Sequence, residues 1–460
     1  MRIVTNLSLL ISIFFTVSCF ATNSSTQEYH FDNGLTLIVK EDHRSPVVIS
    51  EVWYKIGSGY ETLGSTGLSH MLEHLMFKGT PAHPGSALLE LVTQNGGQLN
   101  AFTTRDFTTY YEMLSADKLS LSFQLEADRM ANLTLDPATF NSEHQVVKEE
   151  RQLRIVNDPQ ALTYERFAAA ALPANPYQNP TIGWPSDLNH MTAQDAKNWY
   201  HHWYGPNNAV VVVVGDVNPE VVYNLAKTTF GQLKSIKIPE VKPHDAIKPL
   251  GARKVIVKAP AKLPYLIVGF NTPSVVTAKN SWEPYALEVL SGILASSDSS
   301  RLQRDLVRDK QIASEVDVDY DMYTRLPGLL TIGAIPAQGH TLADLKTALV
   351  VEIKALQKTP VSDEELERIK TQVIANNIYA QDSIEYEAYL IGSMESVGLS
   401  WQEINHYEKE IRDVTPTQVQ AVAQKYLTHD RSTTAELQPL PTNSKIAENS
   451  GSLQGAKNVQ

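Results

Sequence analysis

The chain has 460 residues, of which 42% are hydrophobic and 20% charged, and its formal net charge is −12. This composition is ordinary for a soluble globular protein and excludes disorder over most of the length, while the length exceeds one core and predicts two domains. The acidic balance and the lack of a basic stripe exclude nucleic acid as a partner. Net charge alone favours cationic peptides only weakly.

The first 21 residues have the three-part layout of a secretory signal peptide. Arg2 precedes a mostly apolar run from Leu7 to Val17, and small residues around Ala21 close the segment. The run is shorter than the ~20 residues that a spanning helix needs, so we expect an exported chain with no transmembrane span. The only cysteine, Cys19, stands in a partial lipobox, and lipid anchoring there is the less favoured alternative to cleavage after Ala21.

Strand and helix patterns alternate through the rest of the chain and predict an α+β fold. The runs 35–39 and 47–56 predict strands, 67–78 a helix, and the apolar run 209–214 a buried strand. A stretch at 236–254, rich in proline and lysine and without periodicity, predicts an interdomain linker. The expected division is a signal peptide 1–21, an N-terminal domain 22–235, the linker 236–254, a C-terminal domain 255–440 and a polar tail 441–460.

The two halves look like weak internal repeats. A set of residues in a helical stretch recurs 223 residues later in a second such stretch, namely Thr192, Asp195 and Trp203 against Thr415, Gln418 and Tyr426. We therefore expect two homologous mixed α/β domains.

A His-x-x-Glu-His stretch lies in the predicted helix 67–78. At about 100° per residue, His70, Glu73 and His74 share one face, and the opposite face is apolar. Histidines one turn apart can both reach one zinc ion at ~2.0–2.1 Å, and the carboxylate between them points to the same space. The alternative is two surface histidines that share a turn. Such a motif arises by chance in roughly 2% of chains of this composition, so a third ligand is needed.

Candidates for the third ligand lie at 141–154, which we expect to be helical. Glu143 and Glu150 fall within about 20° of each other on a helix, whereas Glu149 points roughly 120° away. We therefore expect Glu150 to be the ligand and Glu149 a solvated neighbour. His144 is a weaker candidate, because a lone histidine is more often exposed or hydrogen-bonded than metal-bound.

The sequence resembles the pitrilysin and mitochondrial processing peptidase family of inverted-motif zinc peptidases, as a bacterial exported member. Glu150 follows His74 by 76 residues, the spacing typical of that family. Further similar stretches span essentially the whole mature chain, at 57–61, 67–80, 96–101, 106–110 and 203–207. The resemblance implies a clam-like molecule whose N-terminal domain is catalytic and binds one Zn²⁺ per chain.

The same resemblance implies a zinc metalloendopeptidase that hydrolyses peptides or small unfolded polypeptides bound in extended form. His70, His74 and Glu150 would bind the metal, Glu73 would be the general base on the zinc-bound water, and Glu143 would be a further catalytic carboxylate that orients a ligand. With the export segment, this places the protein in the periplasm of a Gram-negative bacterium.

A short strand that follows the turn at 96–97 is the candidate substrate-binding element. In the family, the strand that matches Asn100, Ala101 and Phe102 pairs with an extended substrate through main-chain hydrogen bonds. From the residues alone, an ordinary edge strand is equally favoured.

The second half lacks the metal motif, because the aligned stretch 288–292 has no histidine. Family members often carry a substrate-binding arginine and tyrosine in this half. Arg308 matches the arginine, although a surface ion pair is as favoured for it, and Ser314 stands in place of the tyrosine. We therefore expect a homologous zinc-less partner subunit that carries the Arg/Tyr pair, or a homodimer. The alternative function is a non-catalytic assembly or peptide-binding subunit.

Overall fold

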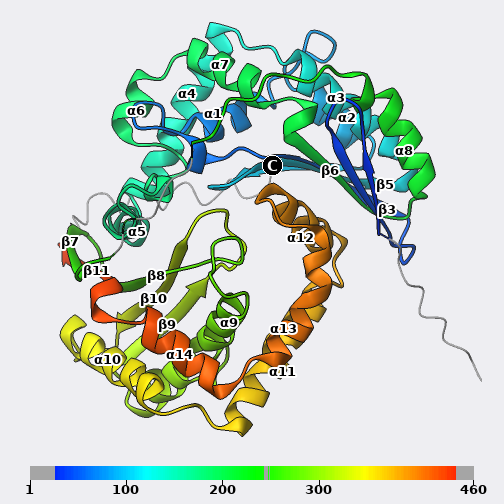
Figure 1. Ribbon diagram of the computed structural model, residues 1–460. Helices are drawn as coiled ribbons and strands as arrows, with labels where there is room; N and C mark the ends of the chain where they lie inside the picture. The colour runs from blue at the N-terminus through cyan, green and yellow to red at the C-terminus, as the bar shows by residue number, and fades with distance from the viewer. Residues whose placement is uncertain (1–25, 243–246, 248, 442–460) are drawn as a thin grey trace, which may run out of the picture.

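The computed structural model describes residues 26–242, 247 and 249–441 and contains two mixed sheets flanked by helices (Figure 1). The α+β class with two similar halves is therefore confirmed. The predicted signal peptide 1–21 and all but the first residue of the tail 441–460 lie outside the described residues. Within the described ranges, no helix is long and apolar enough to cross a membrane.

The first sheet has six strands in the order β1-β2-β6-β3-β5-β4. Its strands are β1 (Thr26–His30), β2 (Thr36–Glu41), β3 (Val47–Tyr54), β4 (Gln98–Thr103), β5 (Thr108–Ser115) and β6 (Ala209–Gly215). Strand β6 is buried along its whole length, as its continuous apolar run predicted. Helices of this half are α1 (Leu68–Leu75), α2 (Ala87–Gln94), α3 (Leu119–Asn132), α4 (Pro137–Arg151), α5 (Pro159–Ala171), α6 (Pro185–His190), α7 (Ala193–Trp203) and α8 (Pro219–Thr228).

The second sheet has five strands in the order β7-β11-β8-β10-β9. These are β7 (Arg253–Pro260), β8 (Tyr265–Thr272), β9 (Ala313–Tyr320), β10 (Gly328–Pro336) and β11 (Ser432–Leu440). The helices of this half are α9 (Trp282–Ala295), α10 (Leu342–Lys358), α11 (Asp363–Ala380), α12 (Ile384–Ser396), α13 (Tyr407–Asp413) and α14 (Pro416–Tyr426).

The two halves repeat one topology. Strands β7, β11, β8, β10 and β9 have the order and the relative directions of β2, β6, β3, β5 and β4. Helices α7 and α14, which lead into β6 and β11, both begin with a capping box, at Thr192 and Thr415. The spacing of 223 residues seen in the sequence therefore marks equivalent helices.

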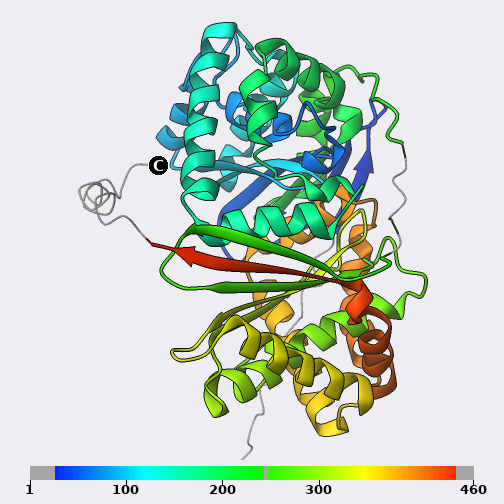
Figure 2. The same ribbon diagram turned by 90° about the vertical axis from the view of Figure 1, so that its left-hand side faces the viewer.

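Each half lends one helix to the sheet of the other half. Helix α5 of the first half packs on β11, β7 and β8, and α12 of the second half packs on β6 and β3 (Figures 1 and 2). A glycine faces an aromatic ring at each crossing. A Cβ on Gly269 of β8 would lie 2.3 Å from Phe167, and one on Gly392 of α12 would lie 2.1 Å from Trp53. A side chain at either glycine would force the layers apart.

A loop between β9 and β10 joins the halves at a third place through Arg325. Its backbone N–H donates to Asp106 (3.1 Å), and its guanidinium donates to the carbonyl of Gly59 (3.0 Å). The guanidinium also lies 3.9 Å from the ring centroid of Tyr60. Asp106 also accepts a hydrogen bond from the hydroxyl of Tyr177 at 2.5 Å, so the carboxylate that binds Arg325 is held in place by a residue of the first half.

The buried carboxyl of Glu51 should make the free energy of unfolding depend on pH. Glu51 is 4% exposed and lies on the face of β3 that α12 covers. Burial raises the pKa of Glu51 to about 8, although Trp53 donates to its carboxyl at 2.8 Å. The folded chain then holds one proton more than the unfolded chain between the unfolded pKa of ~4.3 and about 8. Stability is lost as pH rises through this window, by up to ~1.4 kcal/mol per pH unit.

We expect Glu51→Gln to keep the bond from Trp53 and to flatten this dependence. Urea unfolding at about pH 5 and about pH 8 measures the effect, with the exposed Glu364→Gln as a matched control. An unchanged slope in Glu51→Gln would show that another group is responsible.

Candidate metal centre

Helix α1 is fixed at its N-terminus by Glu61 from the preceding loop. The Glu61 carboxylate accepts the backbone N–H groups of Gly67 and Ser69, both at 2.7 Å, and burial raises its pKa to about 7. Thr66, which directly precedes this stretch, does not cap the helix, because its hydroxyl donates to Asp187 at 2.6 Å. Gly67 has φ 91°, a value that favours glycine at the start of the helix.

The apolar face of α1 holds the helix against the core of the first half. Its residues are at most 4% exposed, as the helical wheel predicted for Leu68, Met71, Leu72, Leu75 and Met76. The opposite face therefore presents His70, Glu73 and His74 to a cleft of about 1420 Å³ that all three line.

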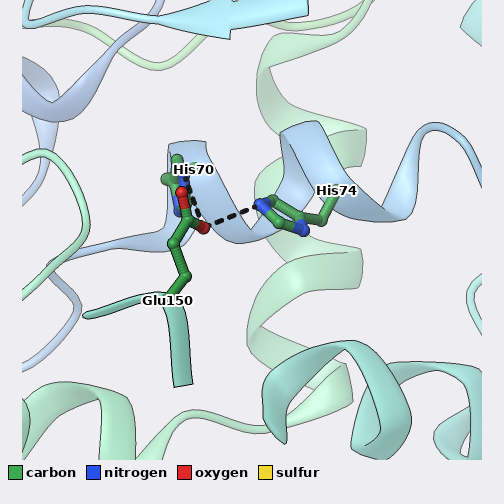
Figure 3. Close-up of side chains that lie close together, drawn as sticks. All are labelled: His70, His74 and Glu150. Atoms are coloured by element: carbon green, nitrogen blue, oxygen red, sulfur yellow. Dashed lines mark ion pairs between the residues drawn. The ribbon is translucent and has the colours of Figure 1, made fainter. Parts of the chain in front are cut away.

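Helix α4 brings Glu150 to the two histidines (Figure 3). Its Oε2 lies 3.6 Å from His70 Nε2 and 3.3 Å from His74 Nε2, and one donor atom from each of the three residues lies within 4.8 Å of the others. Tetrahedral zinc with ligands at ~2.0–2.2 Å requires donors ~3.3–3.6 Å apart. Glu150 Oε2 is also buried without a hydrogen-bond partner among the described residues. The three residues therefore fit a zinc ion, and they leave a fourth position for water or substrate.

The other carboxylates of α4 take separate positions. Glu143 is buried, and its Oε2 lies 3.6 Å from His74 Nδ1 while its Oε1 forms an ion pair with Lys78 at 2.8 Å. Glu149 is exposed, as predicted. His144 points elsewhere, with Nε2 2.5 Å from the carbonyl oxygen of Leu188.

Two contacts in the cleft were not predicted from the sequence. Thr103, at the end of β4, donates to Glu73 Oε2 at 2.5 Å. Arg154 Nε forms an ion pair with Glu150 Oε1 at 3.0 Å. The i,i+4 spacing signals the second contact. The first depends on the packing of β4 against α1, which no local pattern encodes.

At two of the three donor residues, His70 and Glu150, the surroundings favour the deprotonated side chain, which is the form that binds a metal. Burial lowers the pKa of His70, and the contact with His74 lowers that of Glu150, which favours a neutral imidazole and a charged carboxylate. At His74, burial acts against protonation, but the contact with Glu150 raises the pKa. Burial raises the pKa of Glu73, and the bond from Thr103 partly opposes that shift.

The predicted substrate strand lines the same cleft. Asn100, Ala101 and Phe102 lie on β4, an edge strand that pairs only with β5 among the described strands. Arg308 lies apart from them, exposed on a helical turn and outside the lining of the cleft. Ser314 lies on β9, an edge strand of the second sheet.

Comparisons with known proteins show which families and structures this chain is similar to. Residues 36–184 match the model of the insulinase family (peptidase family M16), and residues 190–373 match that of the peptidase M16 inactive domain. The zinc protease PqqE of Helicobacter pylori is 32% identical over 411 residues, which cover 88% of this chain and 91% of that protein. A protein named uncharacterized zinc protease YmxG, from Bacillus subtilis, is 25% identical over 407 residues, which cover 88% of this chain and 96% of that protein.

Solved structures show the same fold. A protease from Helicobacter pylori matches with a TM-score of 0.85 at 30% identity, covering 90% of this chain and 100% of that one. The first half of the periplasmic protease PqqL from Escherichia coli matches with a TM-score of 0.74 over 95% of this chain and 98% of that one. At 19% identity, the second match speaks for the fold alone.

Proposed function

The chain belongs to the insulinase family of M16 peptidases, and we propose that it is itself a zinc metalloendopeptidase. The observation that carries the proposal is the three-donor set of His70, His74 and Glu150, close enough together to hold one zinc ion, beside the carboxylate of Glu73. The substrates we propose are peptides or small unfolded polypeptides.

In this proposal His70, His74 and Glu150 hold one zinc ion per chain. When bound, zinc lowers the pKa of a water molecule and polarises the carbonyl of the bond to be cleaved. Glu73 takes the proton of the attacking water and passes it to the leaving amine. Glu143 acts on His74 from the far side of the ring and fixes its orientation.

The edge of β4 is the proposed binding site for the substrate main chain. A strand with one unpaired edge offers a row of N–H and C=O groups to an extended peptide. Asn100, Ala101 and Phe102 line the cleft beside the metal centre, so a peptide paired there runs past Glu73. Because every peptide offers the same main-chain groups, this mode of binding allows substrates of many different sequences.

Thr103 is expected to position the general base. Thr103→Val removes the donor to Glu73 Oε2, so the carboxylate loses one fixed orientation. We expect kcat to fall by about 10- to 100-fold with the zinc content unchanged. Steady-state kinetics with zinc analysis measures this, and Thr103→Ser should restore most of the rate. If the valine variant is fully active, Glu73 is held by other contacts.

The second half and the assembly complete the proposal. Because Ser314 replaces a tyrosine and Arg308 lies outside the cleft, we propose that a homologous zinc-less partner supplies the Arg/Tyr pair, with a homodimer as the alternative. The signal-like layout of residues 1–21 supports export to a periplasm.

One experiment tests the function and separates it from a non-catalytic peptide-binding role. The purified chain should contain about one zinc ion, lose cleavage of an unfolded polypeptide on treatment with a chelator, and regain it with added zinc. Retained zinc without cleavage, even with a homologous partner added, would favour the non-catalytic alternative. Full activity of the chain alone would contradict the need for a partner.

A further inference from the structure

A second cavity, of about 650 Å³, occupies the place in the C-terminal half that the metal centre occupies in the first half. Helix α1 and edge strand β4 wall the metal centre, and their repeat counterparts α9 and β9 wall this second cavity. Glu288 and Gly292, which align with His70 and His74, both line it. Among the described residues, no metal-binding trio lies there.

The walls of this second cavity are aromatic and acidic. Its lining includes five tyrosines, Tyr320, Tyr323, Tyr386, Tyr389 and Tyr407. The carboxyl groups of Glu288 and Asp321 lie among them, and the lining contains no lysine. Tyrosine faces and carboxylates together form the surroundings that proteins use for organic cations.

Neither carboxyl group is in an ion pair with a described residue. Burial raises the pKa of Glu288 to about 7, and the charges of Asp321 and Asp319 add to the shift. Burial also raises the pKa of Asp321, although the backbone N–H of Tyr323 donates to it at 2.9 Å. A cation in the cavity would reverse both shifts, whereas an apolar group would leave them uncompensated.

The charged groups of the first half that face the cavity are already engaged. Asp106 accepts from Tyr177 and pairs with Arg325 at 3.3 Å. Arg105 donates to the hydroxyl of Tyr164 at 3.1 Å and lies 5.5 Å from the ring centroid of Tyr177. Arg105 attracts Asp319 and Asp321 without forming an ion pair with either.

An acidic row lies on the face of β9 opposite to Val318 and Tyr320, the two residues of this strand that line the cavity. Glu315, Asp317 and Asp319 alternate with more buried residues and are all exposed on one face of this edge strand, in line with Asp321. Partial desolvation by the surrounding chain, together with the charges of Glu315 and Asp319, raises the pKa of Asp317. Like charges in one row are unfavourable unless a cation offsets them.

The second cavity is continuous with the proposed substrate strand. Thr104 to Phe107, which follow β4 directly, form part of its wall. Arg105 and Thr181 line both this cavity and the metal cleft. Phe102 of β4 lies 6.1 Å, centroid to centroid, from Tyr389 of the cavity. A peptide that leaves the end of β4 therefore meets this cavity next.

We propose that the second cavity binds a positively charged side chain, that of arginine or lysine, of a peptide held along β4. The carboxylates of Glu288 and Asp321 would pair with the cation while the tyrosine rings cover it. The proposal rests on the peptidase function and adds a substrate class to it, namely peptides with a basic residue remote from the bond that is cleaved.

The test uses full-length, zinc-loaded protein with Glu73→Gln, so that peptides bind without being cleaved. The probes are blocked peptides of one alanine- and serine-rich sequence, in which a single arginine occupies each position in turn. Each peptide has a twin with citrulline, which is neutral and has nearly the same shape. We expect one position at which the arginine peptide binds about ten-fold tighter than its twin, by fluorescence anisotropy.

The double change Glu288→Gln with Asp321→Asn should make the two twins bind equally, and Glu364→Gln, exposed on α11, should leave the preference intact. Equal binding of all twins to the unaltered cavity overturns the proposal, and that comparison needs no variant of the cavity. A preference that survives the double change also overturns it.

If the wild-type chain cleaves both twins with equal kcat/KM, the peptidase function stands and the cation site fails. If twins are discriminated but none is cleaved, the peptidase function fails instead.

Discussion

Glu73→Gln should lower kcat for peptide cleavage by about 10²- to 10⁴-fold, while the chain keeps one zinc ion. The amide has the shape of the carboxylate and can still accept from Thr103, which lies 2.5 Å from Oε2, but it cannot take a proton from water. Glu73 is not among the three donors of the metal centre, so metal binding does not need it. Cleavage assays with zinc analysis of the same preparation measure both quantities.

The matched control for this change is Glu149→Gln, an equally conservative change at an exposed position of α4. It should leave both activity and zinc content as they are. Zinc near one per chain together with full activity of Glu73→Gln would move the role of base to another group. Loss of zinc in that variant would instead make Glu73 a ligand.

Glu150→Gln should weaken zinc binding by more than about 100-fold, which is the upper range for loss of a group that only orients a ligand. Oε2 of Glu150 lies between the two imidazoles, at 3.6 and 3.3 Å, and an amide carries no charge to offset that of the metal. Competition with a chromogenic chelator measures the dissociation constant. Because Glu149 is exposed, Glu149→Gln should bind zinc as tightly as the parent chain. The opposite order would move the ligand by one residue.

The sequence predicted those parts of the site that depend on one helix. The wheel placed His70, Glu73 and His74 opposite a buried face, and the angle between Glu149 and Glu150 separated an exposed carboxylate from one in the cleft. The same holds for β6, whose apolar run is buried along its length. In these cases periodicity along one element determines which side chains are buried.

The features that could not be predicted depend on residues distant in the sequence. Glu61 caps α1 from a separate loop, and no residue pattern within the helix itself indicates this contact. Thr103 reaches Glu73 because β4 packs against α1. The family resemblance that suggested Arg308 carried no information about which way its helical turn faces. The exchange of α5 and α12 has no signal in periodicity, because a helix shows that it has an apolar face without showing which sheet receives it.

That exchange also bears on the origin of the chain. Two equivalent halves, each covering the sheet of the other with the same helix, have the symmetry of an isologous dimer of two identical copies. In such an ancestor both copies would have carried the same residues at the positions of Glu288 and His70. Joining the two copies in one polypeptide would make the two positions independent, so that one could keep a metal ligand while the other changed. Compared with two separate copies, the covalent connection mainly raises the effective concentration of one half near the other.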